Sequence, residues 1–333
     1  MATTVNSAFK EFLDETVNLD PSVCNAARKS RDWLLKQIHR MPETYDDFPR
    51  LSSKKDIAFG SFARRTKSNP LDDIDLISCM DERGTSYTEY NTGRVRITVD
   101  SQSRLSSMCH GSGRSLNSKR VINRYIKYLS KIGQYQSAPI MRRGEAAVIK
   151  LTSYPWNFDI VPGFYTQPDH NGRNYYLIPD GRGHWQKTDP VIDRDRISRI
   201  NQGNQGYLLN TIRIMKYWNR RKTMPSVPSY MLECLISDFY DGGDVKAEQW
   251  IDLNILDVLE HLETAILKPV IDPKGILPNL NTLTREEKTK ISHRAKSDFN
   301  KAQMASSLED RDMQRASINR WRELFGRDFP GFG

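Results

Sequence analysis

Residues 57–77 read IAFGSFARRTKSNPLDDIDLI, and this stretch decides how the rest of the chain is interpreted. A Gly60-Ser61 pair ends a short apolar run, and residues 62–72 separate it from Asp73-Ile74-Asp75. If residues 74–80 form a strand, side chains alternate between its two faces, so Asp73 and Asp75 point the same way. Two such carboxylates at the end of a buried strand do not both stay charged unless a cation lies between them.

The residues around these carboxylates suit a metal-bound nucleoside triphosphate. Mg²⁺ takes oxygen ligands, usually one or two carboxylates together with the phosphates of a substrate. The Gly60-Ser61 turn offers backbone N–H groups and a hydroxyl, which match phosphate oxygens. A Gly-Ser pair alone is usually a turn, and Asp-x-Asp alone is often a solvated strand end, but their joint occurrence is far more specific.

A third carboxylate lies in a second strand-like segment, residues 154–162, which read YPWNFDIVP. Asp159 stands there between Phe158 and Ile160, and an isolated carboxylate is costly to bury without a partner. We therefore expect Asp159 to share a metal with Asp73 and Asp75.

Composition describes an ordinary globular protein with a basic surface. The chain has 333 residues, of which 38% are hydrophobic and 27% charged, and its formal net charge is +9. That charge favours polyanionic ligands, and nucleotides alone would account for it. The four cysteines, of which Cys79 and Cys109 are two, lack Cys-x-x-Cys spacing, which argues against zinc and against a disulfide framework. No apolar run approaches the ~20 residues of a membrane span and no signal core is visible, so a cytoplasmic location is expected.

Periodicity predicts opening helices, then a mixed sheet, then further helices. A helix is expected from Pro21 to about Met41, with Asp20 as its N-cap. Strands are expected near 55–59, 73–80, 94–100, 146–151 and 156–161, with a short one at 175–178. Residues 101–117 are rich in Ser and Gly and are expected to form a mobile loop. After about residue 200 the chain is expected to be mainly helical.

The pattern of Gly-Ser, Asp-x-Asp and a later single Asp resembles the DNA polymerase β-like nucleotidyltransferases. Further segments resemble the bacterial CD-NTase family, the enzymes related to oligoadenylate synthase and cyclic GMP–AMP synthase: residues 158–162 (FDIVP), 178–181 (IPDG), 185–190, 213–218 (RIMKYW) and 228–230 (PSY). The resemblance covers roughly residues 50 to 240. It implies an α+β fold with a polymerase β-like core at 1–200, a helical nucleotide-binding domain at 201–325 and a flexible tail at 326–333.

The same resemblance assigns three further residues to nucleotide binding. Lys216 lies on a predicted helix whose Arg213 and Arg220 share its face, and related enzymes place such a lysine against the donor triphosphate. Ser229 would contact the phosphates, and Tyr230 would stack on the donor base. From the residues alone, a solvated basic face and an N-cap serine are the alternatives.

The implied activity is a template-independent nucleotidyl transfer that joins nucleoside triphosphates into a cyclic di- or trinucleotide second messenger of anti-phage defence. Two Mg²⁺ ions, replaceable by Mn²⁺, would be held by Asp73, Asp75 and Asp159. An RNA- or protein-directed nucleotidyltransferase is a close alternative, and a catalytically inactive nucleotide- or RNA-binding module is another. The charge of +9 also permits a nucleic-acid activator.

The C-terminal residues 328–333 read DFPGFG. A frayed tail is one interpretation. In a subset of the resembling synthases, ubiquitin-transfer-like accessory enzymes join the C-terminal residue to targets, so Gly333 is a candidate attachment point.

Overall fold

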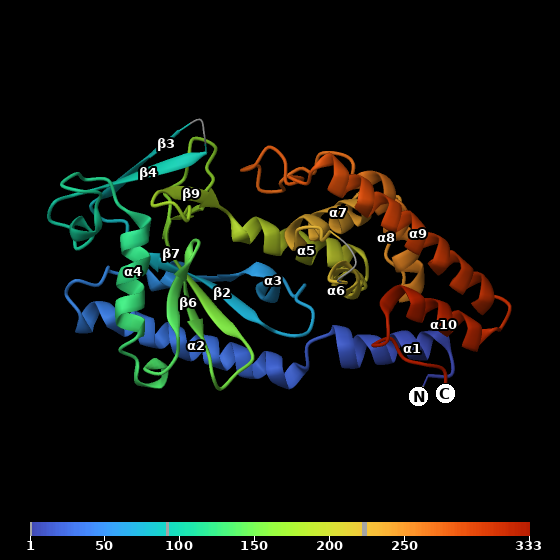
Figure 1. The fold of residues 1–333 in the computed structure, drawn as a ribbon. Coiled ribbons are helices and arrows are strands. Elements are labelled where there is room, and N and C mark those ends of the chain that lie inside the picture. Colours follow the sequence, from blue (N-terminus) through green and yellow to red (C-terminus); the bar gives the residue numbers. More distant parts are fainter. Residues whose placement is uncertain (1, 91–92, 222–224) are drawn as a thin grey trace. The chain divides into compact units, whose positions relative to one another are not determined.

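The computed structural model describes residues 2–90, 93–221 and 225–333 and divides the chain into two compact units (Figure 1). The sheet unit comprises Pro21–Ala63 and Pro70–Val191. The helical unit comprises the residues up to Asp20, the short segment Arg64–Asn69 and the part of the chain from Ile192 to Gly333.

The sheet unit is built around one mixed sheet. Its strands are β1 (Ile57–Phe59), β2 (Asp73–Met80), β3 (Thr85–Glu89), β4 (Arg94–Val99), β5 (Ile140–Arg143), β6 (Ala146–Lys150), β7 (Asn157–Tyr165), β8 (Tyr176–Pro179) and β9 (Trp185–Thr188). Their order is β1-β2-β7-β8-β9-β4-β3, and the β5–β6 hairpin joins through β6 to β7. Only the β2–β7 pairing is parallel among the pairings of the described strands.

Helices α2 (Pro21–Thr44) and α4 (Ser118–Leu129) belong to the same unit, as do the short helix α3 (Gly60–Ala63) and 3₁₀ turns at Ser53–Lys55, Ser106–Met108 and Gly133–Tyr135. Tyr125 of α4 is fully buried, and its hydroxyl lies 3.2 Å from the Ser78 hydroxyl of β2. Ser78 has the parity of Ile74 and Leu76, which are also buried. α4 therefore covers the face of the sheet opposite to that of Asp73 and Asp75.

The helical unit contains α1 (Val5–Phe12) with a π-helical extension (Leu13–Val17), α5 (Pro190–Gly203), α6 (Leu208–Asn219), α7 (Ser229–Asp241), α8 (Ile251–Ala265), α9 (Arg285–Glu309) and α10 (Gln314–Phe325). The two ends of the chain lie side by side within it (Figure 1), since Ala2 pairs with Phe332 in an isolated bridge. None of the helices in the described part of the chain combines the length and apolar composition of a membrane span.

The α+β class is confirmed, and each expected strand has a counterpart. Three further strands, β3, β5 and β9, had not been predicted. Residues 101–117, expected to be a mobile loop, are instead tied to β4 and α4, with Leu105, Met108 and Leu116 buried. The helix expected to end at Met41 continues to Thr44, with Pro42 inside its last turn.

The division into units differs from the expected boundaries at both ends of the chain. Residues 1–20 were expected to belong with the core, but Phe9 and Phe12 of α1 are buried against aromatic rings of α10. Residues 326–333 were expected to be a flexible tail, but Phe329 is fully buried, with its ring 4.9 Å from Phe9 and 5.1 Å from Phe12. Burial of these rings gives each terminus an apolar contact that a periodicity argument cannot locate.

Candidate active site

The parallel pairing of β2 with β7 places the three predicted carboxylates on one face of the sheet. Asp75 is the register partner of Asp159, and Asp73 lies two residues before Asp75 on the same strand. Paired residues of adjacent strands point the same way and are about 4.8 Å apart, so the three side chains share a face. All three carboxylates are half-buried, while their neighbours Ile74 and Phe158 are buried on the other face.

Gly60 lies directly against one of these carboxylates. β1 pairs with β2 so that Phe59 faces Asp75, and the next residue is Gly60 with φ of +72°. A Cβ at this position would lie 1.8 Å from Asp75 Oδ2. Only glycine leaves room for that oxygen, and the positive φ independently favours it. Ser61, the second residue of the predicted pair, is half-buried in the short helix α3 that begins at Gly60.

The donor set fits a hard divalent cation, since carboxylate oxygens are the ligands that Mg²⁺ and Mn²⁺ prefer. The backbone pairing of β2 with β7 places Asp73, Asp75 and Asp159 on one face of the sheet. Within residues 2–90, 93–221 and 225–333, no group of three His, Cys, Asp or Glu is arranged to hold a metal. The three carboxylates therefore match the ion in the chemistry of their oxygens and in strand register.

Lys216 occupies a buried position in the helical unit. Lys216 is only 5% exposed. Its Nζ donates to Thr66 O at 3.0 Å, to Thr66 Oγ1 at 3.3 Å and to the Glu233 carboxylate. An ammonium has three N–H donors, so these acceptors occupy all of them. Burial lowers the pKa of Lys216, and the attraction of Glu233 opposes that effect.

Glu233 joins Lys216 to a second cation. Its other contact is a two-point ion pair with Arg64, whose Nε and Nη2 lie 2.9 and 3.1 Å from the Glu233 oxygens. Burial alone would raise the pKa of Glu233, but Arg64 and Lys216 together outweigh that effect and hold the pKa below its ordinary value. One buried carboxylate therefore fixes both basic side chains.

Tyr230 is tied into an adjoining set of charges. Its hydroxyl donates to Asp193 at 2.5 Å and accepts from Lys274 Nζ at 2.5 Å. Lys274 Nζ also lies 4.0 Å from the centre of the Tyr230 ring, and the Arg64 guanidinium lies 5.3 Å from it. The ring is thus held in a defined orientation by cation–π contacts as well as by its hydroxyl.

Ser229 is the first residue of α7, and its side chain is exposed. The N-cap position is occupied by Pro228, which makes no side-chain capping bond. The capping alternative for Ser229 therefore does not apply in this structure.

The structure places the predicted residues in two groups. Gly60, Asp75 and their partners lie in the sheet unit, whereas Lys216, Ser229 and Tyr230 lie in the helical unit. Sequence reasoning had not singled out the ionic partners of the second group: Arg64, Asp193, Glu233 and Lys274. Arg64 was visible in the gap between Gly60 and Asp73, but nothing in the sequence connected it with a glutamate so distant along the chain.

Comparisons with known proteins find similar proteins over nearly the whole length of this chain. No family model matches it. A curated relative of Bacillus cereus (strain VD146), described as "probable cyclic nucleotide synthase", is 39% identical over 335 residues, covering 99% of each chain. Among solved structures, Escherichia coli MS115-1 CdnC with ATP is similar with a TM-score of 0.71, at 16% identity over 98% of this chain and 99% of that one. Vibrio cholerae DncV, a cyclic AMP-GMP synthase solved with the linear intermediate 5′ pppA(3′,5′)pG, gives a TM-score of 0.67, at 12% identity over 100% and 98%.

The close approach at Gly60 predicts that Gly60→Ala destabilises the sheet unit by about 1–3 kcal/mol, because the substitution adds backbone strain and displaces Asp75. Gly203→Ala is the control, since that glycine ends α5 and a Cβ there would meet nothing within 4 Å. It should change stability by less than about 1 kcal/mol. Urea unfolding of both variants measures the difference, and equal effects would contradict the contact between Gly60 and Asp75.

The buried charges predict a large effect of Glu233→Gln. The substitution keeps the shape of the side chain but leaves Arg64 and Lys216 without a counter-charge, which costs about 3–5 kcal/mol. Asp241→Asn removes the partner of Arg199, whose side chain is 64% exposed, and should cost less than about 1 kcal/mol. Thermal and urea unfolding compare the two variants. A Glu233→Gln protein as stable as the Asp241→Asn protein would show that Glu233 does not hold these cations in solution.

Proposed function

Since this chain belongs to the CD-NTase family of bacterial cyclic nucleotide synthases, we propose that it condenses nucleoside triphosphates into a cyclic di- or trinucleotide and releases pyrophosphate. It is a nucleotidyltransferase that makes cyclic oligonucleotides. We further propose that the product is a second messenger of anti-phage defence. The observation that supports the chemistry best is the register that pairs Asp75 with Asp159 while Gly60 lies against Asp75.

In the proposed reaction the ribose hydroxyl of an acceptor nucleotide attacks the α-phosphorus of a donor triphosphate. A new P–O bond forms, the bond to the pyrophosphate breaks, and the hydroxyl proton passes to a carboxylate oxygen of Asp159. Divalent ions held by Asp73, Asp75 and Asp159 would make that hydroxyl more acidic. They would also neutralise the negative charge of the departing pyrophosphate. No covalent enzyme intermediate is needed, so catalysis is positioning and electrostatics.

Four of the predicted residues would contact phosphate oxygens of the donor. Backbone N–H groups at Gly60 and Ser61, with the Ser61 hydroxyl, suit non-bridging phosphate oxygens. Ser229 offers an exposed hydroxyl for the same purpose. Lys216 would contribute its ammonium, and to do so it must exchange one of its present acceptors, Thr66 or Glu233, for a phosphate oxygen.

Tyr230 would stack on the donor base. The ionic contacts of its hydroxyl and ring hold it in place before a base arrives, which lowers the entropy lost on binding. A ring face tolerates several bases, since stacking does not read their edges.

The deciding experiment incubates the chain with Mg²⁺ or Mn²⁺ and the four nucleoside triphosphates, each labelled in turn, followed by phosphatase treatment and mass spectrometry. We expect phosphatase-resistant label at the mass of a cyclic oligonucleotide. Asp73→Asn and Asp75→Asn should each reduce turnover by at least about 100-fold, because they remove ligands of the ions that the reaction needs.

Other outcomes of this assay separate the alternatives. Linear, phosphatase-sensitive chains would identify an RNA- or protein-directed nucleotidyltransferase. If the unsubstituted chain binds nucleotides without any turnover and Asp73→Asn leaves that binding largely intact, the chain is a binding module. The strand register that places the three carboxylates on one face of the sheet favours an enzyme over such a module.

We also propose Gly333 as the attachment point for ubiquitin-transfer-like accessory enzymes. The residue is exposed, while its N–H donates to Ala2 O at 3.3 Å and Phe329 anchors the preceding segment. Co-expression with such enzymes should give a higher-mass adduct that disappears when Gly333 is deleted. An adduct that survives the deletion would place the attachment elsewhere.

A further inference from the structure

A cavity of about 550 Å³ opens on one face of β4 in the sheet unit. Its lining residues are Tyr90, Arg94, Arg96, His110, Ser115 and His184. Arg94 and Arg96 are two residues apart on β4 and both exposed, whereas Val95 between them is buried. The two guanidinium groups therefore project from the same face of the strand.

The cavity carries positive charge without an acidic counterpart. Two of its six lining residues are arginines, and none is Asp or Glu. Arg94 donates to the His184 ring, and the lining of the cavity contains no carboxylate that could pair with Arg96. An arginine offers five N–H donors in a planar fork, so both groups keep donors for an oxyanion.

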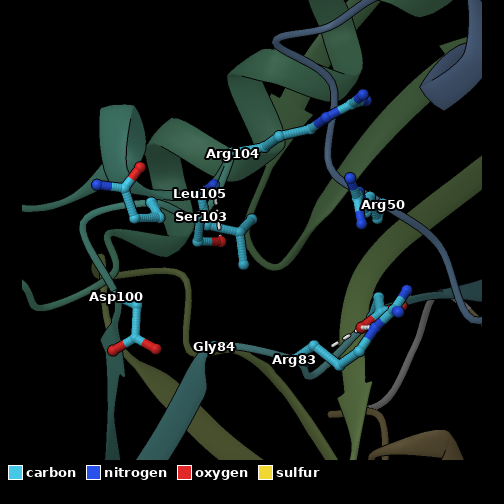
Figure 2. Close-up of a pocket in the computed structure, with 9 residues that line it drawn as sticks. Arg50, Arg83, Gly84, Asp100, Ser103, Arg104 and Leu105 are labelled. Carbon is cyan, nitrogen blue, oxygen red and sulfur yellow. Dashed lines mark hydrogen bonds and ion pairs between the residues drawn. The ribbon is translucent and has the colours of Figure 1, made fainter.

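A second pocket of the same unit has both acidic and basic side chains in its lining (Figure 2). Arg50, Arg83 and Arg104 line it together with Asp81 and Asp100. The Arg83 Nε is 2.8 Å from the Asp81 carboxylate, so this arginine is already neutralised. An arginine in a pocket is thus not by itself an anion site, and the acid-free lining distinguishes the cavity at β4.

The imidazole of His110 is held in a defined tautomer. Asn117 Oδ1 accepts from the backbone N–H groups of Lys119 and Arg120 at the start of α4, which fixes the orientation of its amide. The amide Nδ2 of Asn117 must then donate to His110 Nδ1, at 3.2 Å. The opposite nitrogen, Nε2, donates to the Gly183 carbonyl at 3.1 Å, so the ring hydrogen is on Nε2.

The contact of His184 with Arg94 defines which of its ring nitrogens accepts a hydrogen bond. Its Nε2 faces an Arg94 Nη2 that can only donate, so the ring nitrogen accepts. Burial lowers the pKa of His184, and the charge of Arg94 adds to that effect. The His184 ring stacks on that of His110, with centroids 5.2 Å apart and planes at 19°. The stacked pair and Arg94, which donates to His184, thus form one connected part of the cavity lining.

We propose that this cavity is a binding site for a nucleoside phosphate, separate from the catalytic carboxylates. Arg94 and Arg96 would bind the phosphate, with Ser115 as a further donor. The Tyr90 ring, 45% exposed at the mouth, would stack on the base. A volume of this size is in the range of pockets that hold small ligands.

The site is distinct from the predicted active site within the sheet. In the strand order β7-β8-β9-β4, three strand spacings separate Asp159 from Arg94, which is roughly 14 Å at 4.8 Å per spacing.

The ligand could come from two sources with the same chemistry, a free nucleotide or a linear oligonucleotide made by the enzyme. The proposal does not depend on which nucleotides the active site joins.

The test uses the full chain carrying Asp73→Asn and Asp75→Asn in EDTA, so that metal-dependent binding at the carboxylates is removed. NMR of the six histidine rings reports where a ligand binds. ATP should move the His110 and His184 resonances and leave those of His261 and His293 unchanged. Adenosine, which lacks a phosphate, should move neither pair.

Arg96→Glu should weaken ATP binding by about tenfold or more, the loss expected when a charge-assisted hydrogen bond is removed. The exposed side chain of Arg96 allows this change without loss of folding, which thermal unfolding verifies. Arg83→Glu in the pocket of Figure 2 is the matched control and should change binding by less than about twofold.

The linear dinucleotide pppApA is the second probe. If it binds more tightly than ATP and loses that binding in Arg96→Glu, the enzyme's own intermediate is the ligand. Comparable binding of both probes points to free nucleotide. Unmoved His110 and His184 resonances with both probes would overturn the proposal, as would unchanged binding to the Arg96→Glu chain.

Discussion

The parallel pairing of β2 with β7 is the constraint on which the candidate active site depends. It places Asp159 beside Asp75 in register, although the two residues are far apart in the sequence. Antiparallel β1 then brings Gly60 against Asp75, where any Cβ would collide with the carboxylate. A slip of one residue in the β2–β7 pairing would turn Asp159 to the face opposite Asp75, and a slip in the β1–β2 pairing would move Gly60 away from that carboxylate.

The helical unit meets a different physical requirement, which is to keep two basic side chains charged although they are buried. Glu233 supplies the counter-charge that lets Arg64 and Lys216 stay ionised away from water. The same arrangement occupies the three N–H donors of Lys216. The proposed contact of Lys216 with a phosphate would therefore require the loss of one of these hydrogen bonds.

Where prediction from sequence fell short, the reason was solvent exposure or distance along the chain. β3 and β5 are edge strands whose residues are mostly exposed, so they lack the apolar alternation by which β2 and β7 were recognised. The tail was expected to be flexible because the ends of a chain are poorly ordered unless they are tied down. The deciding feature was the burial of Phe329, which depends on rings at the other end of the chain.

The sequence by itself determined which residue types make up the candidate active site. Gly60-Ser61, Asp73-Ile74-Asp75 and Asp159 identify the residue types, the strand parity and the family, because short-range spacing controls which side chains share a face. Tertiary structure alone decided the partners: which glutamate neutralises Lys216 and which carboxylate orients Tyr230. The physical reason is that ion pairs and aromatic contacts act through space, and their energies depend on distances that the order of residues along the chain does not specify.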